Sequence, residues 1–264
     1  MTGGAGCGAM DGSARNGLSC GRVRFPGSFE FSRGDGLVFS LALLNGGVGT
    51  RVAAGQPKQF LTVNGLPIIV YSLVAADGVD SISQIVLNYP DGYRDAVEKI
   101  VTDYAIKTPI TYVRPGRTRH ESVNLMLPHL ENEHVIIHES ARPLVTSADF
   151  ERIIAHEHPD VSYMLEIPFT VAPVDPTTHH VTGSLERNKL RNVQLPQKFR
   201  KSTLVAAHDY AAREGVDFTE DATLCAIAGF DVRFLDGKDS NFKVTTPIDV
   251  QLAGYLLGGE ANDE

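Results

Sequence analysis

The chain has 264 residues, of which 42% are hydrophobic and 21% are charged, and its formal net charge is -8. This length and apolar content fit one α/β domain with a sizeable core. The negative charge gives no general electrostatic support for nucleic-acid binding. The longest apolar runs, such as residues 37–44, are too short to span a bilayer.

Three cysteines occur in the chain, and their spacing matches no metal-binding motif. No stretch has the pattern of a secretory signal peptide. We therefore expect reduced cysteines and a cytoplasmic protein.

Residues 1–36 are rich in Gly, Ser and Arg and lack hydrophobic periodicity. Such a segment buries too little apolar surface to offset the entropy of ordering it. We expect a disordered leader over 1–36, one domain over 37–258 and a short tail over 259–264.

From residue 37 onward, short apolar runs alternate with helical patterns. Alternating strands and helices are typical of a mostly parallel, Rossmann-like sheet covered on both faces. Ligands bind such sheets beyond the carboxyl ends of the strands, so the turns after Leu44, Val113 and His138 should converge on one site. Strands are predicted at 37–44, 82–88, 110–113, 134–138, 161–167 and 232–235, and helices at 67–76, 91–104, 121–127, 147–156, 203–213, 221–228 and 246–257, with Ser147 and Asp221 as helix caps.

Residues 173–194 break this alternation. The segment contains Pro173, Pro176 and Gly183 and has little helical periodicity. We interpret it as an extended β-hairpin arm that projects from the core. A surface loop without regular structure is the alternative.

A glycine-rich turn follows the first predicted strand. Its sequence is Asn45-Gly46-Gly47-Val48-Gly49-Thr50-Arg51, and Pro57-Lys58-Gln59 comes shortly after. Glycines let backbone N–H groups approach phosphates closely, and Arg51 and Lys58 add positive charge. A dinucleotide fingerprint would need a third glycine at the Gly-x-Gly-x-x-Gly spacing, and a P-loop would need Gly-Lys-Ser/Thr, and neither is present. A Rossmann oxidoreductase would also need an acidic residue where the second strand ends, at Asn88-Tyr89.

Four further motifs follow in order. They are Gly116-Arg117-Thr118-Arg119-His120-Glu121-Ser122-Val123, His138-Glu139-Ser140-Ala141-Arg142-Pro143, Arg187-Asn188-Lys189-Leu190 with Gln194-Leu195-Pro196-Gln197, and Asn241-Phe242-Lys243-Val244-Thr245-Thr246-Pro247-Ile248-Asp249. Together with the glycine-rich turn, they resemble the motifs of the sugar- and polyol-phosphate cytidylyltransferases, over about residues 38–257. This family includes the enzymes that make CDP-methylerythritol and CDP-ribitol. The resemblance implies a nucleotidyltransferase fold of the GT-A-like type and a homodimer formed by the arms.

The resemblance also implies a role for each motif residue in joining CTP to a small polyol phosphate. Arg51 and Lys58 would hold the β- and γ-phosphates, and Lys243 would reach the α-phosphate. Arg142 would hold the acceptor phosphate together with Thr177 and Arg187, the last two from the partner subunit's arm. The nucleotide-binding set would be Asn45, Gly46, Gly47, Gly49, Thr50, Gly116, Arg119 and Ser122.

A divalent metal, Mg²⁺, is the implied cofactor. The family usually places Asp after the His of its fourth strand, and this chain has Glu139 there. A carboxylate is retained, so Mg²⁺ held by one carboxylate and phosphate oxygens remains reasonable. Asp239 is a candidate second ligand. Asn45 and Leu195 also depart from the family pattern, where Ala and Thr are common.

Local details favour D-ribitol 5-phosphate as the acceptor. These are Gly49-Thr50-Arg51, residues 64–70 and Thr118-Arg119-His120, together with Arg191 at a position where the isoprenoid branch often has Trp. The alternative acceptor is 2-C-methyl-D-erythritol 4-phosphate. An alternative of another class is a non-catalytic relative that binds nucleotide.

Overall fold

The computed structural model describes residues 36–47 and 57–258. The predicted leader and tail lie outside these ranges, as do Gly49, Thr50 and Arg51. None of the helices in the two described ranges has both the length and the apolar composition needed to cross a membrane.

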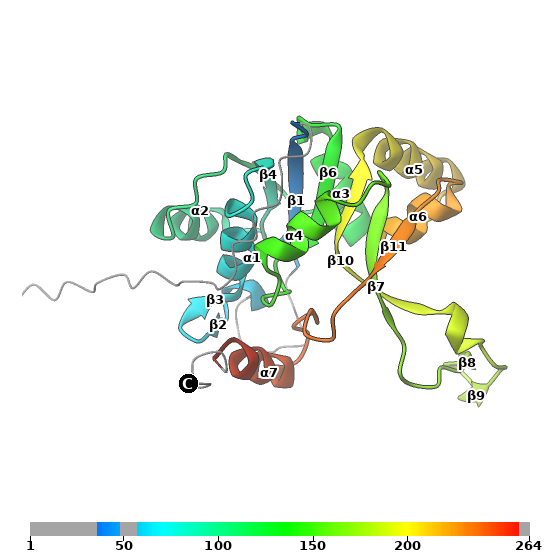
Figure 1. The fold of residues 1–264 in the computed structure, drawn as a ribbon. Helices are drawn as coiled ribbons and strands as arrows, with labels where there is room; N and C mark the ends of the chain where they lie inside the picture. Colours follow the sequence, from blue (N-terminus) through cyan, green and yellow to red (C-terminus); the bar gives the residue numbers. More distant parts are fainter. Residues whose placement is uncertain (1–35, 48–56, 259–264) are drawn as a thin grey trace, which may run out of the picture. The chain divides into compact units, whose positions relative to one another are not determined.

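Seven strands of the described chain form one sheet in the order β11-β7-β10-β6-β1-β4-β5 (Figure 1). Every neighbouring pair is parallel except those of β10, which runs antiparallel to β6 and to β7. The predicted mostly parallel α/β fold is therefore confirmed. The strands are β1 (Phe39–Leu44), β4 (Ile82–Asn88), β5 (Ile110–Val113), β6 (His134–Glu139), β7 (Val161–Glu166), β10 (Arg191–Arg200) and β11 (Arg233–Asp236).

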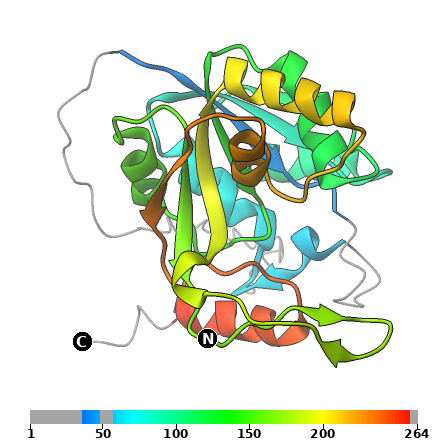
Figure 2. The same cartoon turned by 90° about the vertical axis from the view of Figure 1, so that its right-hand side faces the viewer.

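Helices cover both faces of the sheet (Figures 1 and 2). Side chains alternate along β1, so Leu41 and Leu43 pack on one face while Ala42 and Leu44 pack on the other. The first face packs against α1 (Ile68–Asp77), α2 (Arg94–Asp103) and α4 (Ser147–Ile154), and the second against α3 (Arg119–Met126), the 3₁₀ turn Leu127–His129, α5 (Lys201–Glu214) and α6 (Asp221–Ile227).

Truncation of a fully buried leucine such as Leu41 would cost about 2–5 kcal/mol. This tightly packed centre holds the strand ends at fixed positions, so side chains that follow the strands are placed by the core.

A third cluster joins the chain's last helix to an early hairpin. The helix is α7 (Pro247–Gly258), and the hairpin pairs β2 (Thr62–Val63) with β3 (Leu66–Pro67), directly after the 3₁₀ turn Lys58–Phe60. Val63 and Ala253 are buried against each other's elements. This packing brings the C-terminal motif to the region of the glycine-rich turn.

The predicted arm contains a hairpin of β8 (Val174–Asp175) and β9 (His180–Val181), followed by the 3₁₀ turn Arg187–Lys189. The segment extends away from the sheet (Figures 1 and 2). Its boundary differs from the prediction, because residues 191–194 belong to β10 and pair with β7. Pro196 hid this strand from the sequence pattern. It lies where the β10–β7 register shifts, and proline is tolerated at such an irregularity.

The predicted cap of α4 is wrong by one residue. Thr146 is the N-cap, and its Oγ1 accepts a hydrogen bond from Asp149 N at 3.3 Å. Asp149 Oδ2 in turn accepts one from Thr146 N at 3.0 Å, which completes a capping box. Ser147 instead donates to the Ala75 carbonyl at 2.7 Å and joins α4 to α1.

Candidate active site

The turn after β1 is fixed by the last side chain of β4. Asn88 Oδ1 accepts hydrogen bonds from the backbone N–H groups of Asn45 and Gly46, at 2.5 and 2.8 Å. A Cβ atom on Gly46 would lie 2.6 Å from Pro115 Cβ, in the segment that follows β5. Glycine at this position therefore lets two strand ends approach each other closely.

Two buried polar side chains complete the same turn. Ser140 Oγ donates to Asn45 Oδ1 at 2.6 Å, and Gln59 Nε2 donates to the carbonyls of Asn45 and Gly47 at 2.8 and 2.7 Å. The Asn45 side-chain oxygen thus supports the turn after β6. Direct contact of Asn45, Gly46 or Gly47 with a nucleotide stays a prediction.

Lys58 is buried and joins the glycine-rich region to the C-terminal motif. Its Nζ donates to the Val244 carbonyl at 2.8 Å. Arg51, its predicted partner in phosphate binding, lies outside the described residues, as do Gly49 and Thr50.

The turn after β5 is held by Ser122, a buried residue of α3. Ser122 Oγ accepts from Gly116 N at 3.0 Å and donates to the Thr118 carbonyl at 2.8 Å. A Cβ atom on Gly116 would lie 2.6 Å from Ser122 N, which is too close, so only glycine fits at this position. The structure therefore brings the predicted cytidine-binding residues Gly116 and Ser122 together in one tight turn.

Glu139, at the end of β6, is the centre of a cluster of positive charges. Its carboxylate lies 2.8 Å from Lys243 Nζ, 3.3 Å from Arg119 Nε and 3.9 Å from Arg142 Nε. Burial raises the pKa of Glu139, but the charges of Lys243, Arg119 and Arg142 outweigh it and lower the pKa to about 2. Glu139 is therefore ionised at neutral pH, as a metal ligand must be.

Arg119 bridges two carboxylates, because its Nη2 also lies 2.7 Å from Asp221 Oδ2. Burial lowers the pKa of Arg119, and the charges of Asp221 and Glu139 raise it beyond its ordinary value. The predicted capping role of Asp221 is wrong. Glu220 is the cap of α6, and its carboxylate accepts from Ala222 N and Thr223 N at 3.0 and 2.9 Å.

Arg142 lies beside Glu139, in the turn that follows β6. Its Nη1 donates to the Asn241 carbonyl at 2.7 Å, and the Asn241 side chain donates to the Leu195 carbonyl at 2.5 Å. Burial, above all, lowers the pKa of Arg142. The C-terminal motif is thereby tied to β10 and to β6.

The loop between β11 and α7 is held at its start by Gln194. Gln194 Nε2 donates to the Lys238 carbonyl at 2.9 Å, and its Oε1 accepts from Lys238 N at 3.1 Å. Lys238 Nζ also pairs with the buried Asp149 at 2.5 Å. This loop carries Asp239 and Lys243. The contacts of Lys238 therefore help to place two predicted site residues, both of which line the pocket described below.

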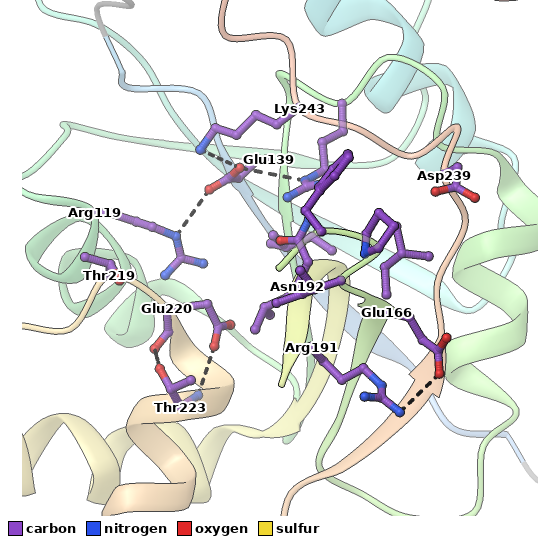
Figure 3. A pocket seen from close by; sticks show the side chains of 17 residues that line it. Arg119, Glu139, Glu166, Arg191, Asn192, Thr219, Glu220, Thr223, Asp239 and Lys243 are labelled. Atoms are coloured by element: carbon purple, nitrogen blue, oxygen red, sulfur yellow. Dashed lines mark hydrogen bonds and ion pairs between the residues drawn. The ribbon is translucent and has the colours of Figure 1, made fainter. Parts of the chain in front are cut away.

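These elements enclose a pocket of about 760 Å³ (Figure 3). Arg119, Glu139, Arg142 and Lys243 form its polar wall, and Figure 3 shows Arg119 and Lys243 meeting at Glu139. The lining also includes apolar side chains, which are Leu165, Ile167, Pro168, Phe169, Val193 and Leu195. A pocket with grouped cations and apolar side chains suits a phosphorylated molecule with a hydrocarbon part.

Thr177 and Arg187, the predicted arm residues, do not line this pocket. Both are exposed. Thr177 N donates to Asp175 Oδ1 at 2.8 Å, and Arg187 Nη1 donates to the Pro168 carbonyl at 3.0 Å. Their contribution to a site on a second copy of the chain stays a prediction.

A metal shared by Glu139 and Asp239 stays a prediction. Figure 3 shows the two carboxylates on different sides of the pocket. Within residues 36–47 and 57–258, no three His, Cys, Asp or Glu side chains are grouped closely enough to hold an ion. Asp239 lies on the β11–α7 loop, next to Lys238, whose backbone N–H donates to Gln194 Oε1 at 3.1 Å.

Sequence reasoning assigned no role in the site to three side chains that hold it together, Asn88, Lys238 and Gln194. Asn88 carried a signal, because a polar residue ends an otherwise apolar strand at the edge where ligands bind. Lys238 and Gln194 act through contacts between segments 44 residues apart, which no local pattern reveals.

The model of the family 2-C-methyl-D-erythritol 4-phosphate cytidylyltransferase matches residues 40–259. The chain belongs to this family. It is therefore a nucleotidyltransferase of the cytidylyltransferase type, as its motifs predict.

Three curated members of the family show the extent of the similarity. The chloroplastic 2-C-methyl-D-erythritol 4-phosphate cytidylyltransferase of Oryza sativa is 32% identical over 83% of this chain and 74% of its own length. The enzyme of that name from Bacillus cytotoxicus is 30% identical over 83% of this chain and 98% of its own. The one from a Synechococcus strain is 35% identical over 80% and 93%.

Solved structures of the family share the fold. The 4-diphosphocytidyl-2C-methyl-D-erythritol synthase of Anaerococcus prevotii aligns with a TM-score of 0.73 and 25% identity, over 84% of this chain and 97% of its own. The 2-C-methyl-D-erythritol 4-phosphate cytidylyltransferase of Thermus thermophilus aligns with a TM-score of 0.65 and 26% identity, over 83% and 98%.

These comparisons favour methylerythritol phosphate over the expected ribitol phosphate. Of the local details that suggested ribitol, Gly49, Thr50 and Arg51 lie outside the described residues, whereas Thr118 and residues 64–70 occupy structural positions. Thr118 caps α3 by accepting from Glu121 N at 3.1 Å, and residues 64–70 form the β2–β3 turn and the start of α1. Arg191, in place of the expected Trp, pairs with Glu166 at 3.4 Å. Arg191 and Arg119, another of these details, also line the pocket, so packing alone explains only Thr118 and residues 64–70.

Proposed function

We propose that this chain transfers the cytidylyl group of CTP to 2-C-methyl-D-erythritol 4-phosphate and releases pyrophosphate. The observation that carries the proposal is the cluster of Lys243, Arg119 and Arg142 around Glu139, inside a pocket of about 760 Å³ at the carboxyl ends of the strands. Membership of the family supports the choice of acceptor.

In this reaction a phosphate oxygen of the acceptor attacks the α-phosphorus of CTP. A new P–O–P linkage forms, the bond from the α-phosphorus to the bridging oxygen of the β-phosphate breaks, and pyrophosphate leaves with that electron pair. Both reactants are anions, so catalysis consists mainly of positioning them and neutralising their charge.

The described cations divide this work by position. Following the family motifs, Lys243 neutralises the α-phosphate and Arg142 the acceptor phosphate, and both stand beside Glu139 on the polar wall. Arg119 lies on the α3 side, next to the Gly116–Ser122 turn that we assign to the cytidine. Lys58, together with Arg51, holds the β- and γ-phosphates and stabilises the departing pyrophosphate.

The site residues fit a divalent cation held by one carboxylate. Glu139 is a hard oxygen ligand that is ionised at neutral pH, and Mg²⁺ is commonly bound by one carboxylate plus substrate phosphates. When bound, Mg²⁺ supplies additional neutralisation of the phosphate charge. Asp239 is left out of this assignment.

The acceptor site is completed by a second copy of the chain. The projecting segment exposes Phe169, Val174 and Val181, which a homodimer would cover. Thr177 and Arg187 of that copy would then contact the acceptor.

The test is pyrophosphate release from CTP and Mg²⁺ with a panel of acceptors: methylerythritol phosphate, ribitol 5-phosphate and glycerol 3-phosphate. We expect release with methylerythritol phosphate at least about tenfold faster than with the others, and little release when UTP or ATP replaces CTP. Preferential turnover of ribitol 5-phosphate would overturn the acceptor assignment. Background release with every acceptor, from protein that binds CTP, would indicate a non-catalytic relative.

A further inference from the structure

Asp221 is a buried carboxylate that lies next to the active site without lining it. It is the first residue of α6 and is 1% exposed. It does not line the pocket, yet its Oδ2 lies 2.7 Å from Nη2 of Arg119, which does. Of the two partners in this ion pair, only Arg119 lines the pocket.

Glu139, the other carboxylate beside Arg119, is shared among several groups. It also faces Lys243 at 2.8 Å and Arg142 at 3.9 Å, and in the proposed reaction it takes part in binding the phosphates and their cation. Its contact with Arg119 is the longer of the two ion pairs that Arg119 makes, 3.3 Å against 2.7 Å. Arg119 thus needs a second anchor that is not drawn into substrate binding.

Packing keeps the Asp221 carboxylate in place. His208 of α5 is buried, and its Nε2 lies 3.7 Å from Asp221 Oδ1. The His208 ring stacks on the His120 ring with centroids 4.3 Å apart, and His120 adjoins Arg119 in α3. The two rings therefore close the space beside Asp221, so its carboxylate remains directed at the guanidinium.

We propose that Asp221 is a positioning residue that holds Arg119 in the pocket for CTP while Glu139 is engaged by the substrates. The proposal rests on the nucleotide-binding role of Arg119 given above. Without the Asp221 charge, the Arg119 guanidinium would pair with Glu139 alone. It would then compete with Lys243 and the bound phosphates for that carboxylate.

The test is CTP affinity, measured by isothermal titration calorimetry with Mg²⁺ and without acceptor. Asp221→Asn keeps the shape of the side chain and removes its charge. We expect the Kd for CTP to rise about tenfold or more, because a charged hydrogen bond is lost from a buried pair.

Asp160→Asn is the matched control. Asp160 is also 1% exposed and pairs with an arginine, Arg200, at 3.4 Å, but unlike Arg119 this arginine does not line the pocket. Both variants should melt at a lower temperature than the wild type. Asp160→Asn should keep the wild-type Kd for CTP, so loss of binding in Asp221→Asn alone separates positioning from general destabilisation.

A double-mutant cycle with Arg119→Met decides whether Asp221 acts through Arg119. We expect Arg119→Met alone to weaken CTP binding, and Asp221→Asn to add almost nothing to it. The double variant removes both charges and so avoids an unpaired buried arginine if Asp221→Asn folds poorly. Additive losses of affinity, or an Asp221→Asn Kd within twofold of the wild type, would overturn the proposal.

Two further outcomes separate this proposal from the proposed function. Unchanged CTP affinity in Arg119→Met would overturn both the role of Arg119 and that of Asp221. Failure of the acceptor assignment would appear only in the pyrophosphate assay, because the titration contains no acceptor.

Discussion

Glu139 and Thr177 are both assigned to the chemistry of phosphate transfer, but their surroundings differ. Glu139 is 7% exposed and lies within 4 Å of three cationic side chains from α3, the turn after β6 and the C-terminal loop. Thr177 is exposed, and its backbone N–H donates a local hydrogen bond to Asp175. One region is fixed by contacts between distant segments, and the other by contacts within its own hairpin.

This difference shows how the work of the site is divided. The polar wall is organised by contacts within a single chain, because ion pairing holds its charges in place. The projecting segment has no such support within the described chain. It becomes part of a site only when something packs against it, and the proposed homodimer provides that surface.

The largest expected effect comes from removing a charge of the polar wall. Lys243→Ala should lower kcat by about 10²- to 10³-fold, because it removes a cation placed where negative charge develops. The measurement is steady-state pyrophosphate release with saturating CTP and acceptor. Lys99→Ala, which removes an exposed lysine paired with Asp103 on α2, is the control and should keep wild-type kcat. Equal activity of both variants would contradict the assignment of Lys243.

A second test concerns the stability that Glu139 contributes through its cations. Its pKa falls from 4.5 to about 2 on folding, so the folded state favours the ionised form. This contribution is fully present above about pH 4.5 and is lost as the pH falls toward 2, and it amounts to about 3 kcal/mol. Glu139→Gln should therefore be less stable than the wild type by about this amount at pH 7, and nearly equal to it at pH 2.

Chemical unfolding at a series of pH values measures this difference. Glu98→Gln, which removes an exposed carboxylate of α2, is the control and should follow the wild-type curve. A constant gap between Glu139→Gln and the wild type at all pH values would show that the carboxylate is not held ionised by its neighbours.

Most of the fold was predictable because its elements carry local signals. The strands over 82–88 and 110–113 were predicted with the bounds that the structure has, since each is a short apolar run between polar segments. β10 was missed because Pro196 interrupts its pattern and because an antiparallel strand breaks the alternation expected of a parallel sheet. Its place between β6 and β7 is set by long-range pairing.

The site was predictable in its residues but not in its contacts. Motif resemblance named Arg119, Glu139, Arg142 and Lys243, and the structure brings these four together. It gave no sign that Asp221 pairs with Arg119, because the two lie on different helices about 100 positions apart in the chain. The acceptor preference failed for a related reason: some of the local differences used for it lie in caps and turns, and the sequence does not show which of the others, such as Arg191 on the pocket wall, contact the acceptor.

A smaller effect is expected from the projecting segment. Thr177→Ala and Arg187→Ala should each raise the KM for the acceptor about tenfold, because each removes one hydrogen bond to a charged group. The KM for CTP and the melting temperature should change little, since both side chains are exposed. Thr178→Ala and Lys189→Ala are matched controls from the same segment and should keep the wild-type KM.

The oligomeric state sharpens this test, because the effect requires the arm of a second copy. Light scattering should give a dimer for the wild type and for both variants. A strictly monomeric wild type with normal acceptor KM would contradict the proposed arrangement. A fall in kcat without a change in acceptor KM would place these residues elsewhere in the reaction.

The smallest effect is expected from the local contacts of the hairpin. We expect them to affect the KM for the acceptor but not the melting temperature. Asp175 Oδ1 accepts hydrogen bonds from Thr177 N and Thr178 N, at 2.8 and 3.2 Å, and all three residues lie at the hairpin tip. Asp175→Ala should leave the melting temperature unchanged, because the contacts are exposed to water. The KM for the acceptor should rise about two- to fivefold, as expected from one modest hydrogen bond that positions Thr177. Asp175→Asn keeps the accepting oxygen and should restore the wild-type KM, whereas an equal loss in both variants would mean that the charge matters and not the turn.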